Sequence, residues 1–186
     1  ELCTVTLFDR GKKTGKVLLS AHWKRDEQQP PPDAGQVGTL HIDLSHGVGL
    51  AARDPTGLSD PYVKLRLGQL EKKSMIVKKT LEPRWHEHFV FYGVYGELAR
   101  DPLVVNCWDW DFMTDDEHMG TGRVDVRRLL QATPDSLRAV TLSDGQAKPG
   151  KVFLCGHWEP DYDATKRKSM AELSVAEHKA AHTKIE

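Results

Sequence analysis

The chain has 186 residues, of which 39% are hydrophobic and 28% are charged, and its formal net charge is −1. This size and composition suit one well-packed domain with additional segments, and the near-neutral charge gives no indication of a nucleic-acid partner. No stretch approaches the roughly 18 apolar residues of a membrane-spanning helix, and the three cysteines have no CxxC spacing, so we expect free thiols in a reducing compartment.

Residues 1–23 repeat residues 136–158. At an offset of 135 the two segments align without a gap and are identical at 12 of 23 positions. A repeat at the distance of one domain indicates an array, so we expect the chain to be part of a longer protein with at least two such domains. Residues 1–23 are then the last strands of a preceding domain, or extra strands added to this one. Residues 24–37 are charged and then proline-rich, which predicts an extended linker.

The main domain is predicted over residues 38–160 and opens with a strand, in which Leu40, Ile42 and Leu44 alternate with polar residues. Regularly spaced short strands predict an all-β fold, an eight-stranded antiparallel β-sandwich with its loops at its two ends. A short helix is predicted over residues 126–131. The clearest of the further strands are predicted over residues 62–67, 86–91, 103–108, 120–126, 139–142 and 151–158.

Two acidic loops interrupt these strands. The first places Asp54 and Asp60 six residues apart across a glycine-containing turn, and the second carries five carboxylates in the nine positions from Asp109 to Glu117. Residues two apart on a strand point to the same side, so Asp109 and Asp111 are expected to present parallel carboxylates, with the acidic run after them bending back.

A fold that gathers these carboxylates has to offset the repulsion between their negative charges. Two unit charges about 4 Å apart repel by on the order of 4 kcal/mol at an effective dielectric of about 20. The fold therefore needs raised carboxyl pKa values or a hard cation such as Ca²⁺, which takes roughly 6–8 oxygen ligands. The alternative is a solvated acidic loop without a ligand.

Three sequence runs carry a resemblance to a known family: DPTGLSDPYVKL, TLEPRWHEHFVF and WDWDFMTDDEHMG. In this order and spacing they resemble the C2 domain family, the calcium-dependent lipid-binding modules of conventional protein kinases C, synaptotagmins and extended synaptotagmins. The resemblance covers residues 37–160 and implies the C2 fold, which exists in two circularly permuted topologies. No copy of the opening strand follows Trp158, so we favour type II, in which residues 152–158 close the domain.

The resemblance also implies a ligand set for Ca²⁺. Main-chain carbonyls of Arg53 and Trp110 are expected to contribute, and Asp115 and Asp116 to substitute for a ligand or add a third site. Glu117 stands where the family usually has aspartate, and its extra methylene is expected to shift or weaken the second ion. The five acidic ligands implied are Asp54, Asp60, Asp109, Asp111 and Glu117.

Bound Ca²⁺ nearly cancels the loop charge and leaves coordination positions for lipid oxygens. The expected function is therefore calcium-dependent binding to anionic phospholipids, phosphatidylserine and also phosphoinositides, which recruits the parent protein to cytoplasmic membrane surfaces for trafficking or fusion. The residues expected to contact the membrane are Leu58, Phe112, Met113 and Thr114; the alternative is that the apolar ones fold back onto the sandwich. A basic face resembling the family's polyphosphoinositide-binding strand pair, or else a solvated strand face, is formed by Lys64, Arg66, Lys72, Lys73, Lys78 and Lys79.

No catalytic group is recognised, because the sequence has no GxSxG and no nucleophile with an evident base, so we expect a binding module and not an enzyme. The alternatives are a calcium-independent scaffold or protein-interaction domain and a regulatory arm of a larger enzyme. His86 and His88 share a predicted strand face and could bind zinc with a third ligand, although such pairs are more often surface residues. The tail, residues 161–186, starts basic and is expected to be helical, or disordered in isolation, and to offer a site for protein partners.

Overall fold

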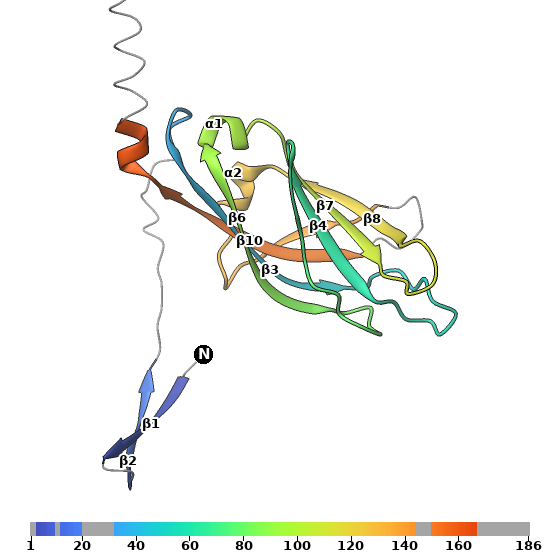
Figure 1. The fold of residues 1–186 in the computed structure, drawn as a ribbon, viewed down its shortest axis with the longest axis horizontal. Coiled ribbons are helices and arrows are strands. Elements are labelled where there is room, and N and C mark those ends of the chain that lie inside the picture. The colour runs from blue at the N-terminus through green and yellow to red at the C-terminus, as the bar shows by residue number, and fades with distance from the viewer. Residues whose placement is uncertain (1–2, 10–11, 20–31, 144–149, 167–186) are drawn as a thin grey trace, which may run out of the picture. The chain divides into compact units, whose positions relative to one another are not determined.

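The structure, a computed structural model, describes residues 3–9, 12–19, 32–143 and 150–166 (Figure 1). The chain divides into two compact units, residues 1–31 and residues 32–186. In the first unit the described residues form a two-stranded antiparallel hairpin of β1 (Cys3–Asp9) and β2 (Lys12–Leu19).

The second unit is a β-sandwich of two four-stranded antiparallel sheets, as the sequence predicts. One sheet has the strand order β6-β3-β10-β9 and the other has the order β5-β4-β7-β8. The strands are β3 (Val37–Val48), β4 (Pro61–Leu67), β5 (Leu70–Lys73), β6 (Arg84–Val94), β7 (Leu103–Asp109), β8 (Glu117–Val124), β9 (Arg138–Thr141) and β10 (Lys151–Pro160), and the helices are α1 (Tyr95–Leu98) and α2 (Val126–Leu129).

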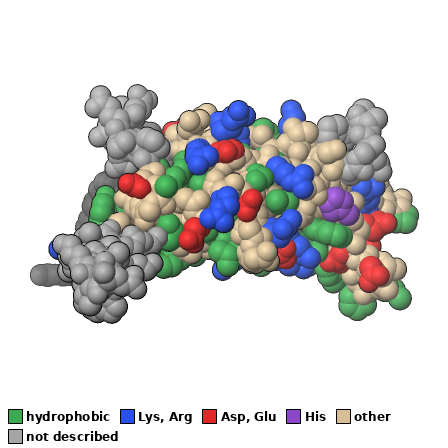
Figure 2. Space-filling model, turned by 90° about the horizontal axis from the view of Figure 1, so that it is seen from above, with side chains coloured by type: hydrophobic (Ala, Val, Ile, Leu, Met, Phe, Trp, Pro, Cys, Tyr) green, Lys and Arg blue, Asp and Glu red, His purple; other side chains and the backbone are tan. Residues whose placement is uncertain are grey.

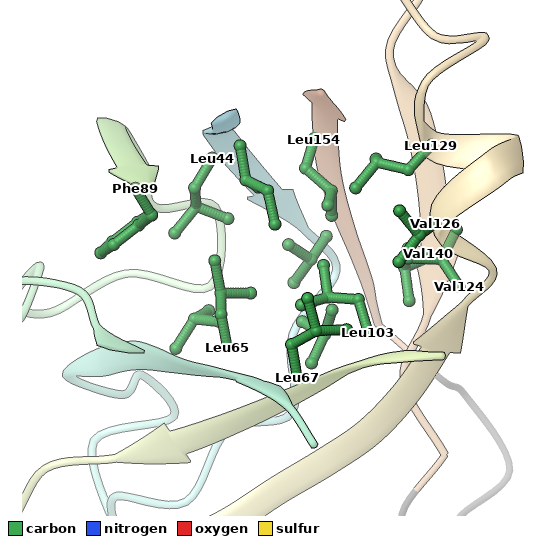
Figure 3. Packing of buried hydrophobic residues seen from close by; sticks show 14 of the residues in the cluster. Leu44, Leu65, Leu67, Phe89, Leu103, Val124, Val126, Leu129, Val140 and Leu154 are labelled. Atoms are coloured by element: carbon green, nitrogen blue, oxygen red, sulfur yellow. The ribbon is translucent and has the colours of Figure 1, made fainter. Parts of the chain in front are cut away.

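The core lies between the two sheets (Figure 3). On β3 the predicted alternation is confirmed, because Leu40, Ile42 and Leu44 are fully buried while the residues between them are half-buried. The facing sheet contributes Leu65 of β4 and Leu103 of β7, both fully buried. Burying one such side chain stabilises a fold by about 1.5–3 kcal/mol, so this interior holds the two sheets in fixed positions and with them the loops at their ends.

Several predicted boundaries differ from the structure in detail. Strand β8 begins at Glu117, three residues before its predicted start. The predicted helix over residues 126–131 is the single turn α2, whose first N–H groups are capped by the carboxylate of Asp125. Strand β10 is the last strand of the sandwich and pairs with both β3 and β9. Residues 162–166 of the predicted tail are helical, and residues 167–186 lie outside the described part.

The strand pairing brings the two acidic loops to one end of the sandwich. Asp109, the last residue of β7, pairs with Pro61 at the start of β4 and with Glu117 at the start of β8. The loops before β4 and between β7 and β8 therefore lie side by side at the right of Figure 1, whereas α1 and α2 lie at the opposite end. Within the described ranges, no helix combines the length and the apolar character needed to span a bilayer.

Candidate metal site at the loop end

The first acidic loop is built on a tight turn. The N–H of Gly57, whose φ is +78°, donates to the carbonyl of Asp54 at 3.0 Å, and the N–H groups of Arg53 and Asp54 both donate to the carbonyl of Leu58. Glycine adopts this left-handed conformation without steric cost. The fully buried Ser59 accepts a further hydrogen bond from the N–H of Arg53 at 3.0 Å. These bonds fix the half-buried Asp54 at the rim of the site.

The two loops meet at Asp109, which is only 1% exposed. Its Oδ1 accepts a hydrogen bond from the backbone N–H of Asp60 at 2.5 Å. The hydroxyl of Ser59 lies close to this carboxylate but donates to the carbonyl of Ala51 at 3.1 Å. Oδ2 of Asp109 is thus buried and has no hydrogen-bond partner among the described residues. A buried, unpartnered carboxylate oxygen is costly, which makes it the strongest single indication of a cation here.

Burial raises the pKa of Asp109. The hydrogen bond from the backbone N–H of Asp60 and the nearby Ser59 hydroxyl oppose this shift, whereas the negative charges of Asp54 and Asp111 add to it. A cation bound among these carboxylates would reverse both the desolvation cost and the repulsion.

Asp60 and Asp111 approach Asp109 from different loops. Oδ1 of Asp60 accepts a hydrogen bond from the backbone N–H of Lys79 at 2.7 Å, and its carbonyl accepts one from the N–H of Trp110 at 3.0 Å. Because β7 ends at Asp109, strand alternation does not reach Asp111, which is half-buried in the loop beyond. The expectation of two parallel carboxylates on one strand is therefore wrong, and the two residues differ strongly in burial.

Asp116 anchors the second loop. Its Oδ2 accepts a hydrogen bond from the hydroxyl of Tyr62 at 2.6 Å, and its Oδ1 accepts one from the N–H of Asp111 at 3.3 Å, so the loop bends back as predicted. The hydrogen bond from Tyr62 lowers the pKa of Asp116, with smaller contributions from Asp111, Lys73 and Lys64. Tyr62 itself is buried, and burial raises its pKa. Sequence reasoning read Tyr62 only as the start of a strand and missed this role.

The remaining predicted ligands occupy more open positions. Glu117 is exposed at the start of β8, and Asp115 is exposed in the loop. The guanidinium of Arg53 donates to the carbonyl of His118 at 2.9 Å and so ties the first loop to the base of the second. Among the described residues, no three acidic, histidine or cysteine side chains are already gathered closely enough to hold a metal ion. The structure thus joins the backbone N–H of Asp60 to the carboxylate of Asp109 but leaves Glu117 and Asp115 at the rim.

The apolar side chains at the tip of the second loop point to solvent. Phe112 is 85% exposed and Met113 is 90% exposed, and Thr114 beside them is exposed as well. The alternative that these two apolar residues fold back onto the sandwich is therefore wrong in this structure. Leu58 of the first loop is 36% exposed. Exposed large apolar groups at a loop tip commonly mark an interaction surface.

The six residues of the predicted basic face do not form one group. Lys64 and Lys73 face each other across β4 and β5, and their Nζ atoms lie over the rings of Trp108 and Tyr62 at 5.2 Å and 3.8 Å from the centroids. Arg66 is exposed two residues along the same face. Figure 2 shows Lys and Arg side chains spread over the middle of one face and acidic and hydrophobic ones together at its right-hand end.

The other three lysines lie elsewhere. Lys72 is paired with the buried Leu65 and so alternates to the other side of the sheet. Lys79 contacts Asp60 through its backbone, and Nζ of Lys78 lies 4.8 Å from the centroid of the Trp110 ring. Lys78 and Lys79 therefore belong to the loop end and not to the strand pair.

Comparisons with known proteins agree with this geometry. The family model described as the C2 domain matches residues 38–139, more than half of the chain. The chain is 42% identical over 92 residues to the human multiple C2 and transmembrane domain-containing protein 1, a match that covers 50% of this chain and 9% of that protein. The chain spans less than two thirds of the length of the curated relatives that it matches.

Two solved structures are similar to the chain. A C2 domain of plant extended synaptotagmin 1 matches with a TM-score of 0.55 and 28% identity, over 67% of this chain and 96% of that chain. A calcium-bound structure of two C2 domains of extended synaptotagmin 2 matches with a TM-score of 0.52 and 26% identity, over 66% of this chain and 46% of that chain.

Proposed function

Because this chain belongs to the C2 domain family, we propose that it binds anionic phospholipid membranes in response to calcium and so recruits the protein that contains it to membrane surfaces. Membership of the family supports membrane or lipid binding in general and makes the chain a binding module. Calcium dependence and the choice of anionic lipid are the parts that we add.

The observation that carries the proposal is the buried, unpartnered Oδ2 of Asp109. An all-oxygen set of aspartate and glutamate side chains and carbonyls suits Ca²⁺, which tolerates irregular geometry. In the proposal Asp109 and Asp60 hold the ion first, since the backbone N–H of Asp60 already ties the two residues together through Oδ1 of Asp109. Asp54, Asp111 and Glu117 then complete the site, with the carbonyls of Arg53 and Trp110. Asp115 remains a candidate for a further ion.

Asp116 receives a different role in this proposal. Both of its oxygens already accept hydrogen bonds, from Tyr62 and from the backbone of Asp111. We assign it to positioning Asp111, so that it shapes the second loop before any ion binds.

Calcium acts in this proposal as a switch and as a bridge. Without it, the carboxylates at the loop end repel an anionic bilayer. With it, the charge is nearly cancelled, lipid phosphate or carboxylate oxygens complete the coordination, and the exposed Phe112 and Met113 enter the headgroup region beside Thr114 and Leu58. An apolar side chain of this size contributes about 1.5–3 kcal/mol when fully buried.

The basic strand pair extends the contact to multiply charged lipids. Lys64, Lys73 and Arg66 share one sheet face, and each basic residue near an anionic surface contributes about 1 kcal/mol. We propose that this group binds phosphoinositide headgroups, with Lys78 and Lys79 nearer the calcium loops. Such lipids and the buried free thiols of Cys107 and Cys155 fit peripheral association with cytoplasmic membrane surfaces.

Vesicle pelleting tests the proposal. Phosphatidylserine vesicles are expected to pellet the chain with calcium and to release it when a chelator is added. The double substitution Asp109→Asn with Asp111→Asn should abolish the calcium response. The matched control is Asp101→Asn with Asp135→Asn, two exposed aspartates whose replacement changes the charge equally. Undiminished pelleting by the loop double variant, or an absence of calcium heat in calorimetry, would instead favour a calcium-independent interaction domain.

We also propose that β1 and β2 are the closing hairpin of a preceding domain of the same kind. Val5 pairs with Val17 and Thr6 with Lys16, which is the pairing of β9 with β10 moved by the repeat offset of 135: Val140 with Val152 and Thr141 with Lys151. A two-stranded hairpin is marginally stable alone. Deleting residues 1–31 should leave the melting temperature and vesicle binding of the remaining chain unchanged, and a large drop would assign the hairpin to this domain instead.

A further inference from the structure

Three histidines lie together on the outer face of the sheet that does not carry the basic strand pair. His41 comes from β3, His88 from β6 and His157 from β10, and these strands lie side by side in the order β6-β3-β10 (Figure 1). The ring of His157 is stacked on that of His41 with centroids 4.3 Å apart, and the centroids of His41 and His88 are 5.1 Å apart. These three residues form the histidine cluster. The proposed calcium response makes no use of it.

Two of the three rings are held by carboxylates. Nε2 of His41 lies 3.0 Å from Oε2 of Glu159, and Nδ1 of His88 lies 2.7 Å from Oδ1 of Asp43. An ionised carboxylate can only accept a hydrogen bond, so both of these ring nitrogens carry a proton. In neutral rings the other two nitrogens, Nδ1 of His41 and Nε2 of His88, are then both acceptors. These two acceptors face each other at 3.0 Å.

Two facing lone pairs repel, so this arrangement needs a cation between them. We propose that Nδ1 of His41 and Nε2 of His88 bind a divalent transition-metal ion of the zinc type. Imidazole nitrogen suits such ions, whereas Ca²⁺ takes oxygen ligands. A histidine that binds a metal almost always donates its other N–H to a carboxylate, a carbonyl or water, which fixes its tautomer and its orientation. Glu159 and Asp43 provide this support here.

The cluster has two ligands in place and a third imidazole beside them. Two nitrogens bound to tetrahedral zinc at about 2.0–2.1 Å lie roughly 3.3 Å apart with the ion off the line that joins them, so the pair has to open slightly from its 3.0 Å separation and the rings have to tilt until both lone pairs point at the ion. No three metal-binding side chains in residues 32–143 and 150–166 already surround one point. In the proposal His157, stacked on His41 with centroids 4.3 Å apart, is the nearest candidate for a third ligand, and water completes the coordination.

A shared proton is the competing occupant. One extra proton between Nδ1 of His41 and Nε2 of His88 turns their contact into an ordinary hydrogen bond without a metal. Because the proton and the metal would use the same two nitrogen lone pairs, the test has to distinguish them.

Zinc titration of the whole chain by calorimetry provides that test. All variants carry Asp109→Asn and Asp111→Asn, which remove the acidic loops as a second zinc site. We expect one Zn²⁺ per chain, and His41→Gln with His88→Gln should weaken binding at least about 10-fold. The matched control, His46→Gln with His86→Gln, changes two other histidines of the same two strands and should leave binding unchanged. Asp43→Asn should weaken binding by about 10-fold to 100-fold, the usual effect of losing such a support.

The imidazole nitrogen resonances give a readout that a structural role would not change. Zinc should shift the ¹⁵N signals of Nδ1 of His41 and Nε2 of His88, and leave the protons on the two outer nitrogens in place. Circular dichroism checks that the glutamine variants fold. Equal zinc binding by the double glutamine variant overturns the proposal. So does an absence of stoichiometric binding up to about 100 μM zinc, which would leave a shared proton as the occupant.

Discussion

Replacing Asp109 by asparagine should stabilise the calcium-free domain and abolish its response to calcium. In the folded chain Asp109 is 1% exposed, its Oδ2 has no hydrogen-bond partner among the described residues, and burial raises its pKa. Asparagine keeps the acceptor for the N–H of Asp60. Its amide replaces the unpartnered oxygen with a donor close to the carboxylates of Asp54 and Asp111. The substitution therefore removes a desolvation cost and two repulsions.

The expected magnitudes follow from these contacts. Leaving a buried polar group unpaired costs about 1–3 kcal/mol, and we expect recovery of about 1 kcal/mol. For a unit of this size that corresponds to roughly 3–4 °C in melting temperature. Calcium at about 100 times its dissociation constant should stabilise the wild type by about 2.7 kcal/mol, or roughly 8–11 °C, and the variant by nothing measurable.

Thermal melts by circular dichroism, with chelator and with calcium, measure both quantities. Asp101→Asn is the control, because Asp101 is exposed near the opposite end of the sandwich and should change neither melting temperature. The reasoning fails if Asp109→Asn melts below the wild type in chelator while still shifting with calcium. That outcome would mean that the carboxylate is paired in the calcium-free protein and is no ligand.

Three further predictions concern neighbouring groups. Tyr62→Phe should lower the free energy of unfolding by about 1.5 kcal/mol at pH 7. Because the hydrogen bond from Tyr62 lowers the pKa of Asp116 in the fold, this loss is complete above about pH 3.9 and disappears as the pH falls through the lowered pKa of Asp116. Urea unfolding at several pH values measures it. Phe112→Ala should weaken calcium-dependent vesicle binding about 10-fold without changing calcium affinity in calorimetry. Lys64→Ala with Lys73→Ala should weaken binding to phosphoinositide vesicles about 30-fold and leave phosphatidylserine binding nearly unchanged.

Control variants and contrary outcomes separate these predictions from their alternatives. Val90→Ala changes another exposed apolar residue, on strand β6, and is the control for Phe112→Ala. Equal losses of vesicle binding from the two variants would exclude insertion of the loop tip. Lys72→Ala is the control for the Lys64 and Lys73 pair, since Lys72 alternates to the other side of the sheet. It should leave phosphoinositide binding unchanged if the pair acts through its shared sheet face. A pH-independent cost of Tyr62→Phe would mean that its hydroxyl does not stabilise the ionised form of Asp116.

The strands that carry the core could be predicted from the sequence because burial on one face imposes alternation. Leu40, Ile42 and Leu44 show that pattern, and the structure confirms it. The start of β8 could not be predicted in this way, because Glu117 and His118 pair with β7 through their backbones while their side chains remain polar. Alternation also failed at Asp109 and Asp111, since it presumes that the strand continues and β7 ends between them.

The histidine cluster shows a limit of a different kind. His86 and His88 are neighbours along β6, and periodicity alone pairs them. The structure instead joins His88 to His41, because the antiparallel pairing of β3 with β6 sets His88 opposite Asp43, two residues along β6 from Val90, the partner of His41. His46 shows the same dependence on strand pairing, because β6 sets Arg84 opposite it. Burial lowers the pKa of His46, and the positive charges of Arg84 and His86 lower it further. Register between distant strands, and not residue type, decides which side chains meet.

Opposite pKa shifts sort the acidic residues of the loop end by role. Asp116 accepts the hydroxyl of Tyr62 and has its pKa lowered, so its charge is already stabilised without a cation. Asp109 is buried with one oxygen unpartnered and has its pKa raised, so its charge is stabilised fully only when a cation arrives. As the pH falls, protons therefore begin to displace calcium from Asp109 at a higher pH than from an ordinary carboxyl. The hydrogen bond from Tyr62 to the ionised Asp116 persists to a lower pH. Acidification should therefore release the ion while the second loop keeps its shape.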